Sequence, residues 1–412
     1  MGLTTAACLA QSGHDVVLVD TDRDKLATLA AGHTPFHEPG LDDVIGRAFA
    51  AGKLSFEHGS QLAEYGDVAV IAVGTPATPS GAADLRFVRS VVDQLAREAP
   101  AATVAVMKST VPPGTGASLS AVLAVAGIHY ASNPEFLREG SAVDDWFHAD
   151  RIVIGGDEVA VARTRELYAD IDAPIVVCDV TSAEMIKYAS NAFLATKVSF
   201  INEIAALCDR VGANVDVVAE GVGADRRIGR SFLAAGIGYG GSCFPKDTRA
   251  LDFLSAMNGY DFHLLKAVIE VNARQRLLPL IVLHERFGSL DGRRIAVLGL
   301  TFKPNTDDTR ESPGREILEL LFAEGADVVA YDPVGKLVGL PADVAQAESI
   351  AQAVSGADAA IVATEWTQIV GADWATLAAS MAPDAVVFDG RNAIDAAAIK
   401  RAGRVYIGVG RR

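Results

Sequence analysis

Short, almost continuously apolar runs alternate with helical segments in the first third of the chain. The runs His14–Asp20, Val68–Val73 and Thr103–Met107 are each of strand length and are followed by turn residues. Strands that are apolar on both faces are typical of parallel sheets covered by helices. The segments 22–31 and 85–99 between them have helical spacing. This alternation predicts a doubly wound α/β domain.

The middle of the chain follows a different pattern. Thr181 and Glu184 fit a Thr-x-x-Glu capping box, and helical spacing then continues without Gly or Pro as far as Val211. About 30 residues at 1.5 Å each make a rod of roughly 45 Å. Its apolar residues lie on more than one side, so we expect the rod to join two domains or to form a dimer interface. Helical, Ala-rich sequence continues to about Phe287, interrupted by the Gly-rich segment 236–246.

The alternation of strands and helices restarts after Gly292. Strands are expected at 294–300, 327–331, 359–363 and 385–389, and a helix at 313–324. The chain is therefore predicted to form two Rossmann-like, doubly wound α/β lobes, joined by a long central helix and a helical dimerisation region. The expected domain bounds are 1–180, 181–287 and 288–412.

Charge and composition exclude several classes of protein. The chain has 36 Lys and Arg against 52 Asp and Glu, a formal net charge of −16. Such a surface repels nucleic acid and anionic membranes, so neither is expected as a partner. No apolar run reaches the roughly 18 residues of a membrane span, and no signal-like segment opens the chain. The four scattered cysteines form no CxxC pair, which favours the reducing cytoplasm, and no metal site is expected.

The N-terminal segment has the pattern of a dinucleotide fold that lacks its first strand. The segment 2–10 has helical spacing, and the following strand ends at Asp20, where such folds place the acid that binds the ribose hydroxyls of NAD. The helix should follow a strand and a GxGxxG turn, of which only Gly2 can be the third glycine. We therefore expect one strand and two glycines to be missing, which leaves strand edges exposed and NAD binding weakened. The alternative for Asp20 is an ordinary carboxylate at a strand end.

The segment GYGGSCFPKD, residues 238–247, is the most informative part of the sequence. Packing alone does not favour three glycines around one cysteine, because Gly is costly where its freedom is not needed. Cys243 in such a loop is open to close approach by a ligand, and Lys246 and Asp247 can manage the protons of a nucleophilic thiolate. The alternative is a structural loop with an inert cysteine.

Two further segments carry polar groups in an apolar context. Lys187 and Asn191 are four apart on the long helix, where they can bind an oxyanion or a water, unless they belong to a solvated face. In SNPEFLRE, Glu135 and Glu139 are either a base and a ligand anchor or the acids of an ordinary helix start. The segment KSTVPPG places hydroxyls and a rigid Pro-Pro turn after the third apolar strand, at the sheet edge where ligands bind.

These segments together resemble the UDP-glucose/GDP-mannose dehydrogenase family. The similarity covers nearly the whole chain and rests on the blocks GHDVVLVD, EPGL, AVGTP, KSTVPPG, NPEFLREGSA, EMIKYASNAFLATKVSFINEIA, GYGGSCFPKD, GLTFKPNTDDTRESP, ATEW and DGRN. The resemblance implies a four-electron oxidation of UDP-glucose to UDP-glucuronate, a polysaccharide precursor, with two NAD molecules used in turn. GDP-mannose or another nucleotide sugar is the alternative substrate.

The resemblance also implies the role of each catalytic residue. Cys243 would capture the aldehyde as a thiohemiacetal, which a second hydride transfer converts to a thioester. The other expected catalytic residues are Lys187 and Asn191 for the oxyanions, Asp247 and Thr110 for the water that removes the alcohol proton, and Glu135 for thioester hydrolysis.

The expected ligand-binding residues are distributed over three domains. Residues 1–180 are expected to bind NAD, residues 181–287 to form the dimer and contact the substrate, and residues 288–412 to bind the UDP-sugar. The residues expected to bind NAD are Gly2, Asp20, Lys25, Thr75, Thr110, Glu139, Lys246 and Arg310. Those expected to bind the sugar nucleotide are Glu135, Phe136, Leu137, Arg138, Glu139, Lys187, Asn191, Arg227, Phe232, Leu233, Gly236, Gly240, Lys303 and Arg391. Arg227 is expected to reach the site of a second subunit, which predicts a homodimer.

Two other functions fit parts of the pattern. A two-electron hydroxyacid dehydrogenase of the 6-phosphogluconate type would share the α/β lobe, the long helix and the Lys-xxx-Asn pair, but it would need neither Cys243 nor a second lobe. A non-catalytic protein that binds nucleotide sugars would fit a chain without the cofactor turn, although Cys243, Lys187 and Asp247 are all present.

Overall fold

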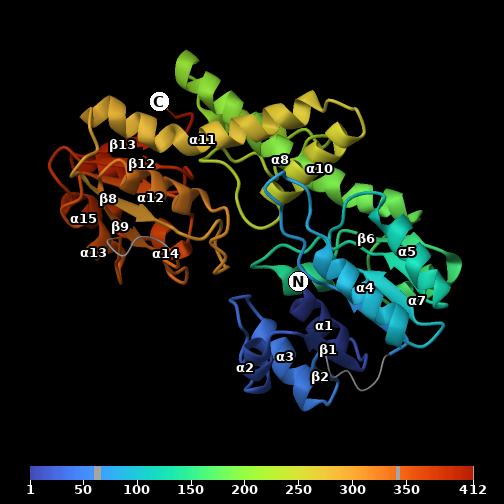
Figure 1. The fold of residues 1–412 in the computed structure, drawn as a ribbon. Helices are drawn as coiled ribbons and strands as arrows, with labels where there is room; N and C mark the ends of the chain where they lie inside the picture. The colour runs from blue at the N-terminus through green and yellow to red at the C-terminus, as the bar shows by residue number, and fades with distance from the viewer. Residues whose placement is uncertain (60–65, 340–343, 412) are drawn as a thin grey trace. The chain divides into compact units, whose positions relative to one another are not determined.

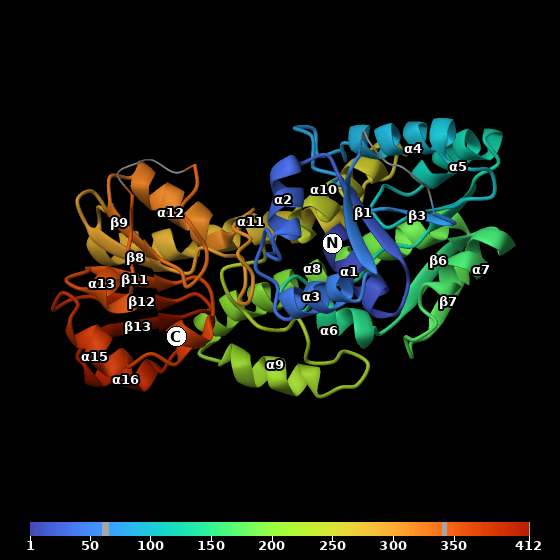
Figure 2. The same ribbon diagram turned by 90° about the horizontal axis from the view of Figure 1, so that it is seen from below.

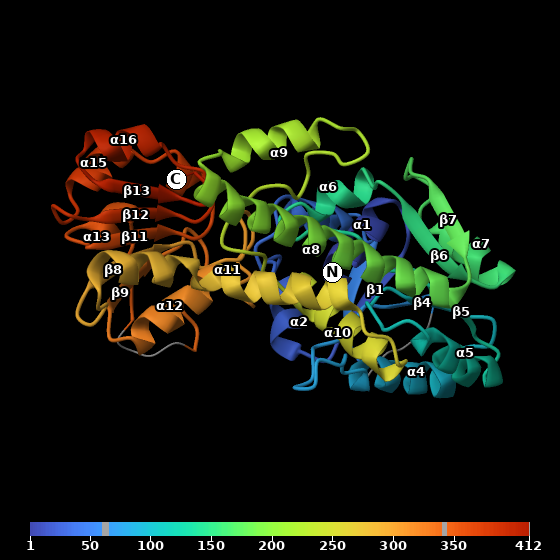
Figure 3. The ribbon, with the colours of Figure 1, turned by 90° about the horizontal axis from the view of Figure 1, so that it is seen from above.

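A computed structural model describes residues 1–59, 66–339 and 344–411. The chain divides into two compact units, Met1–Ser190 and Asn191–Arg412, and each is considered by itself. Helix α8 (Val180–Val211) runs across the division as one uninterrupted helix, drawn in green in Figure 3. Both units are mixed α/β structures with parallel sheets, which confirms the predicted fold class.

The first unit contains a five-stranded sheet in the order β3-β4-β5-β6-β7, in which only the β5–β6 pair is antiparallel. Its strands are β3 (Val68–Ile71), β4 (Val104–Met107), β5 (His129–Ser132), β6 (Ile152–Gly156) and β7 (Ile175–Cys178). Its helices are α1 (Gly2–Gln11), α2 (Arg23–Ala30), α3 (Leu41–Ala50), α4 (Arg86–Glu98), α5 (Thr115–Val125), α6 (Ala142–Phe147) and α7 (Glu158–Glu166). Figure 2 shows β6 and β7 with α7 beside them.

Helices cover both faces of this sheet, as successive residues of β4 demonstrate. Val104 and Val106 pack in the core that holds Cys8 and Leu9 of α1, whereas Ala105 and Met107 pack in the core with α4 and α5. The period of two residues along a strand sends neighbouring side chains to opposite faces. The continuous apolar run is therefore explained by burial on both faces.

Two strands stand apart from the larger sheet. Strands β1 (Val16–Asp20) and β2 (Leu54–His58) form a separate parallel pair, and within the described residues β1 and β3 are not hydrogen-bonded to each other. Val17 and Val19 of β1 are 45% and 42% exposed.

The second unit is built on a six-stranded, wholly parallel sheet in the order β10-β9-β8-β11-β12-β13. Its strands are β8 (Arg294–Leu298), β9 (Asp327–Tyr331), β10 (Ala345–Gln346), β11 (Ala359–Val362), β12 (Val386–Asp389) and β13 (Val405–Gly408). Helices α11 (His263–Phe287) and α12 (Pro313–Ala323) pack on one face (Figure 1), and α13 (Ile350–Val354), α15 (Trp374–Ala379) and α16 (Ala396–Arg401) pack on the other. The remaining helices are α9 (Val215–Gly223), α10 (Phe244–Met257) and α14 (Thr367–Val370).

The expected strands and helices are present, but two local interpretations are wrong. The Thr-x-x-Glu capping box does not form, because Asp179 accepts the hydrogen bond from the backbone N–H of Ser182 and Glu184 binds elsewhere. Glu135 and Glu139 do not open a helix, because residues 133–138 are irregular and α6 begins only at Ala142. No helix among the described residues is long and apolar enough to cross a membrane.

Glycines of the Gly-rich loop lie where close packing leaves no room for a side chain. A Cβ at Gly240 would lie 2.2 Å from the carbonyl oxygen of Glu311, whereas one at Gly221, inside α9, would meet nothing within 4 Å. Gly240→Ala should lower the free energy of unfolding by roughly 1–3 kcal/mol, because backbone must shift. Gly221→Ala should raise it by roughly 0.5–1 kcal/mol, because Gly is unfavourable in a helix. Equal effects in denaturant unfolding of the two variants would contradict this account.

Candidate functional site

In the first unit, three loops leave the same edge of the five-stranded sheet. Thr75 follows β3, Thr110 follows β4 and Asn133 follows β5, and these strands are parallel. The hydroxyl of buried Thr75 donates a hydrogen bond of 2.9 Å to the carbonyl oxygen of Thr110. In open α/β sheets this edge is where ligands bind. This hydrogen bond therefore links Thr75 and Thr110, which are both predicted from the sequence to bind the cofactor.

Lys187 and Glu135 form a buried ion pair. Lys187 Nζ lies 3.6 Å from Glu135 Oε1, and the two side chains are 5% and 7% exposed. The ammonium also lies 5.3 Å from the ring centroid of Phe136. Asn191 is buried as well, so a solvated helix face is excluded for both helix residues. Charges in a dry environment interact strongly with a developing charge, which suits oxyanion stabilisation.

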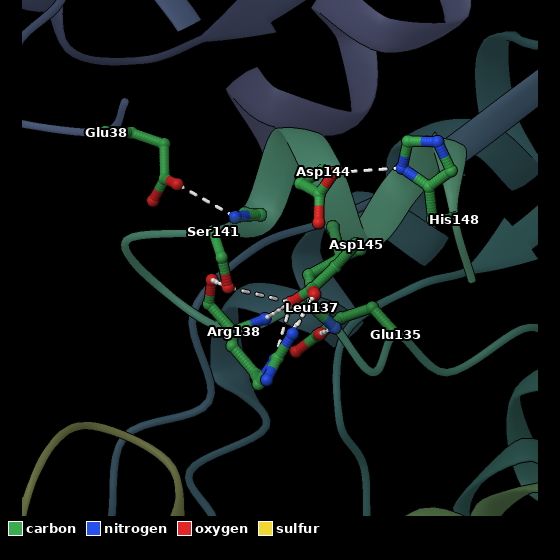
Figure 4. A network of polar contacts seen from close by, with 9 residues as sticks. Glu38, Glu135, Leu137, Arg138, Ser141, Asp144, Asp145 and His148 are labelled. Atoms are coloured by element: carbon green, nitrogen blue, oxygen red, sulfur yellow. Dashed lines mark hydrogen bonds and ion pairs between the residues drawn. The ribbon is translucent and has the colours of Figure 1, made fainter. Parts of the chain in front are cut away.

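The loop that carries Glu135 is held by hydrogen bonds from both sides (Figure 4). Glu135 accepts the backbone N–H of Leu137 at 2.7 Å, and Arg138 pairs with Asp145 at 2.5 Å. Burial of Asp145 is outweighed by the hydrogen bonds from Arg138, so the pKa of this carboxyl is lowered. Glu38, of the EPGL motif, accepts the backbone N–H groups of residues 140 and 142 at 2.7 and 2.8 Å. Substrate-contact residues predicted from the sequence thus lie on an anchored loop.

Lys108 is a buried cation that sequence reasoning missed. Its Nζ donates to Asn133 Oδ1 at 3.1 Å and to the Tyr168 hydroxyl at 2.6 Å, and it lies 5.3 Å from the ring centroid of Trp146. Within the described residues no carboxylate pairs with it. The sequence signal for this residue was its place directly after a fully apolar strand, where a lysine on the surface is not expected. This ammonium ties the loops after β4 and β5 together.

In the second unit, Cys243 begins a helix beside a cluster of polar side chains. Cys243 is the N-cap of α10, is half-buried, and has its Sγ 3.7 Å from the Ser242 hydroxyl. Asp247, one turn later, is buried and accepts hydrogen bonds from Asn191 Nδ2 at 2.6 Å and Lys246 Nζ at 2.5 Å. A helix N-terminus stabilises an anionic sulfur. The structure thus brings Asn191, Lys246 and Asp247 into one cluster, one helical turn from Cys243.

The Gly-rich loop before Cys243 contacts two other predicted segments. The backbone N–H of Gly241 donates to the carbonyl of Arg310 at 3.2 Å, and Arg391 donates to the carbonyl of Gly238 at 3.3 Å. A Cβ at Gly236 would lie 2.6 Å from the carbonyl oxygen of Gly390. The loop is therefore fixed from the side of α12 and from the DGRN segment.

The other predicted residues of the second unit occupy different environments. Phe232 has a positive φ of 63° and its ring centroid lies 6.0 Å from that of Phe244. Lys303 Nζ lies 5.4 Å from the Phe302 ring centroid, and Leu233 is buried in the core. Arg227 is 88% exposed and pairs with Asp225 at 2.6 Å. Within one chain Arg227 therefore lies on the surface, outside the buried polar clusters.

The sequence is similar throughout to one group of enzymes. Sequence models of the UDP-glucose/GDP-mannose dehydrogenase family match the chain with its NAD binding domain (1–172), its central domain (181–274) and its UDP binding domain (296–396). The chain belongs to this family. The UDP-glucose 6-dehydrogenase YwqF of Bacillus subtilis is 45% identical over 100% of this chain and 96% of that protein. The UDP-glucose 6-dehydrogenase of Pseudomonas aeruginosa is 42% identical over 100% and 95%.

A solved structure supports the same placement. The UDP-glucose dehydrogenase from Pyrobaculum islandicum is 40% identical to the chain and superposes with a TM-score of 0.89, covering 99% of this chain and 95% of that one. The chain is therefore an NAD-dependent dehydrogenase of the UDP-glucose/GDP-mannose dehydrogenase family. The match of residues 1–172 to the NAD binding domain identifies NAD as its cofactor.

Gly2 and Asp20 of the first unit have positions that fit this cofactor. A Cβ at Gly2 would lie 3.3 Å from both Cβ and the carbonyl oxygen of Ala72, as expected for the glycine that lets a helix pack closely on a strand. Asp20 ends β1 and accepts the N–H of Asp22 at 2.9 Å, which orients its carboxylate at the strand end. Lys25 is exposed in the following helix, with Asp22 at 3.4 Å. Among the described residues no cluster of His, Cys, Asp and Glu could hold a metal ion.

Proposed function

We propose that this chain oxidises UDP-glucose to UDP-glucuronate with two molecules of NAD. The observation that carries this proposal is the placement of Cys243 at the N-terminus of α10, next to the buried Asp247–Asn191–Lys246 cluster. An oxidation that stops at the aldehyde needs no thiol. A thiol in that position supplies the covalent step that carries an aldehyde to an acid.

The four-electron reaction then runs through Cys243. The alcohol carbon first loses a hydride, and its hydroxyl proton passes to a water held by Asp247. The thiol adds to the resulting aldehyde, so that a C–S bond forms and the carbonyl oxygen takes a proton. Loss of a second hydride and a proton gives the thioester. Water then breaks the C–S bond and releases the carboxylate and the thiol. When bound, NAD would supply the hydride acceptor for each of the two oxidations.

The buried polar residues have roles that follow from their charge. Lys187 and Asn191 donate hydrogen bonds to the oxygen that gains negative charge when sulfur or water adds to the carbonyl carbon. Glu135, paired with Lys187 at 3.6 Å, assists the water of hydrolysis. The other cysteines are poor nucleophiles: burial raises the pKa of Cys8 to about 12, burial and Asp179 raise that of Cys178, and Cys208 lies in the apolar core.

UDP-glucose is favoured over GDP-mannose by the relatives named above. Two of them are named UDP-glucose 6-dehydrogenases and cover the whole chain at 42% identity or more. The basic residues Lys303 and Arg391 of the UDP-sugar domain, with Arg227, would neutralise the diphosphate, which the acidic surface cannot do. The three domains 1–180, 181–287 and 288–412 would bind NAD, a second subunit and the UDP-sugar.

The exposed side of α8 supports a homodimer. Phe193, Phe200 and Leu207 are seven residues apart and are 66%, 51% and 54% exposed in the single chain, and Val211 extends the same stripe. Large apolar residues at this spacing form a continuous helical seam, which a second copy of the helix would cover. In the dimer, Arg227 would reach the site of the partner. The dimer is proposed to work in the cytoplasm, where a reduced thiol such as Cys243 persists.

Cys243→Ser should abolish formation of the acid and leave binding of the UDP-sugar within a few-fold, because a hydroxyl is a weak nucleophile without a dedicated base. The wild-type protein should yield two NADH per uronate in a spectrophotometric assay with product quantified by chromatography. Cys178→Ser is the matched control and should retain activity. One NADH per substrate, or unchanged uronate production by the Cys243 variant, would refute the covalent mechanism.

Lys187→Ala should lower kcat by roughly 10²–10³, the usual effect of losing one oxyanion donor. Lys266→Ala, which removes an exposed lysine paired with Asp261, serves as the control and should leave kcat unchanged. Steady-state kinetics measure both. A rise in KM alone would make Lys187 a binding residue instead.

Phe200→Asp should convert the dimer to monomers, because a charge in the centre of the apolar stripe cannot be buried without a partner. Val125→Asp, a change at a 91% exposed position of α5, should leave the dimer intact. Analytical ultracentrifugation at micromolar concentration distinguishes the two states. A wild-type chain that sediments as a fully active monomer would contradict the proposal.

A further inference from the structure

Glu184 of α8 caps a different helix. The carboxylate is buried, and its two oxygens accept the backbone N–H groups of Gly114 and Gly116, each at 2.7 Å. Gly114 is the N-cap of α5 and has no side-chain cap of its own. The first N–H groups of a helix lack partners within the helix, and here a residue about 70 positions away supplies both acceptors.

The backbone around Gly116 is shaped for this carboxylate. A Cβ at Gly116 would lie 2.7 Å from Glu184 Oε1, 2.9 Å from Tyr130 Cε1 and 2.4 Å from Val180 Cγ1. Gly114 has a φ of +93°, which side chains rarely adopt. Gly116 is glycine because α8 approaches the start of α5 so closely that no side chain fits, whereas Gly114 has open space around it and is favoured as glycine by its positive φ.

The carboxylate is held there at an energetic cost. Burial raises the pKa of Glu184 to about 7, and the hydrogen bonds from Gly116 and Gly114 offset this only in part. The charge of Asp179 raises the pKa of Glu184 further. The neighbouring Tyr130 is neutral, because burial raises the pKa of its hydroxyl. Because the pKa of Glu184 is higher in the folded state, its favourable contribution to the free energy of unfolding is present below about pH 4.5. This contribution is lost as pH rises through 7. Near neutral pH the ionised group therefore does not serve stability.

The two hydrogen bonds fix a loop that carries a predicted catalytic residue. Thr110 lies four residues before Gly114, with the rigid pair Pro112–Pro113 between them. The other end of this loop is held by Thr75, which donates to the carbonyl of Thr110. Glu184 lies three residues before Lys187 on the same helix. One carboxylate thus sets the position of the Thr110 loop relative to the Lys187–Glu135 pair.

We propose that Glu184 is a positioning residue, which holds the Thr110 loop in register with Lys187 for the oxidation of the alcohol. It contacts neither substrate nor cofactor and acts through backbone N–H groups. The inference rests on the proposed function for its effect on turnover. The anchoring of α5 by Glu184 is independent of that function and is measured separately.

The test replaces Glu184 by Gln in the full-length chain. Glutamine offers one acceptor and one NH₂ group, so one of the two backbone N–H groups loses its acceptor. Glu184→Gln should speed hydrogen exchange of the amides in residues 114–117 at least tenfold. It should lower kcat at least tenfold with KM within threefold. Glu158→Gln, an exposed glutamate at the start of α7, should change neither quantity.

The pH dependence of stability gives a second readout. At position 184 only the wild-type glutamate titrates between pH 5.5 and 8.5. The wild-type protein therefore loses stability from this group as pH rises through that range. The Tm of Glu184→Gln minus that of the wild type should therefore increase over this range. If Glu184→Gln does not fold, Gly116→Ala should give the same loss of kcat, because its Cβ displaces the carboxylate.

The outcomes separate the two proposals. Unchanged amide exchange in Glu184→Gln would overturn the anchoring. Faster exchange with wild-type kcat would overturn the positioning role. If the wild-type chain forms no NADH from UDP-glucose, the proposed function fails, while the exchange data still decide whether Glu184 anchors α5.

Discussion

The continuity of α8 is the constraint on which the site depends. A helix without Gly or Pro keeps the spacing of its side chains fixed, so residues three and seven positions apart lie on one face. On α8 this face carries Glu184, Lys187 and Asn191, which contact α5, Glu135 and Asp247 respectively. A break anywhere between Glu184 and Asn191 would change the relative direction of all three side chains. The helix therefore fixes the spacing of these three side chains along one face.

Buried carboxylates recur as acceptors for the backbone of distant segments. Glu38 binds two N–H groups at the start of α6, and Glu184 binds two at the start of α5. In the second unit, buried Asp332 accepts the backbone N–H groups of residues 300, 301, 334 and 335. A carboxyl group has two oxygens with several acceptor sites, so one side chain satisfies several backbone donors at once. The loops at the strand ends are in this way held still without regular secondary structure.

The buried cations serve a different purpose. Lys187 is paired with Glu135, so its charge is balanced until a substrate oxygen becomes negative. Lys108 has only neutral partners among the described residues, namely Asn133, Tyr168 and the ring of Trp146. A buried ammonium is costly unless it is compensated by hydrogen bonds and aromatic faces. Its positive charge, held between the loops after β4 and β5, favours anionic groups at that edge of the sheet.

The sequence by itself determined the class of fold, the family and the residues with reactive groups. Apolar runs such as Val104–Met107 are recognised from a few consecutive residues, so the sequence alone shows them. The Gly-rich loop around Cys243 is likewise recognised from adjacent residues alone. Only the tertiary structure decided where Glu184 and Lys108 make their bonds. The spacing of Thr181 and Glu184 fits a capping box, but the two N–H groups that Glu184 binds lie 68 and 70 residues away. Long-range packing of α8 against α5 overrides the local pattern, because a buried carboxylate binds the donors that the fold brings to it.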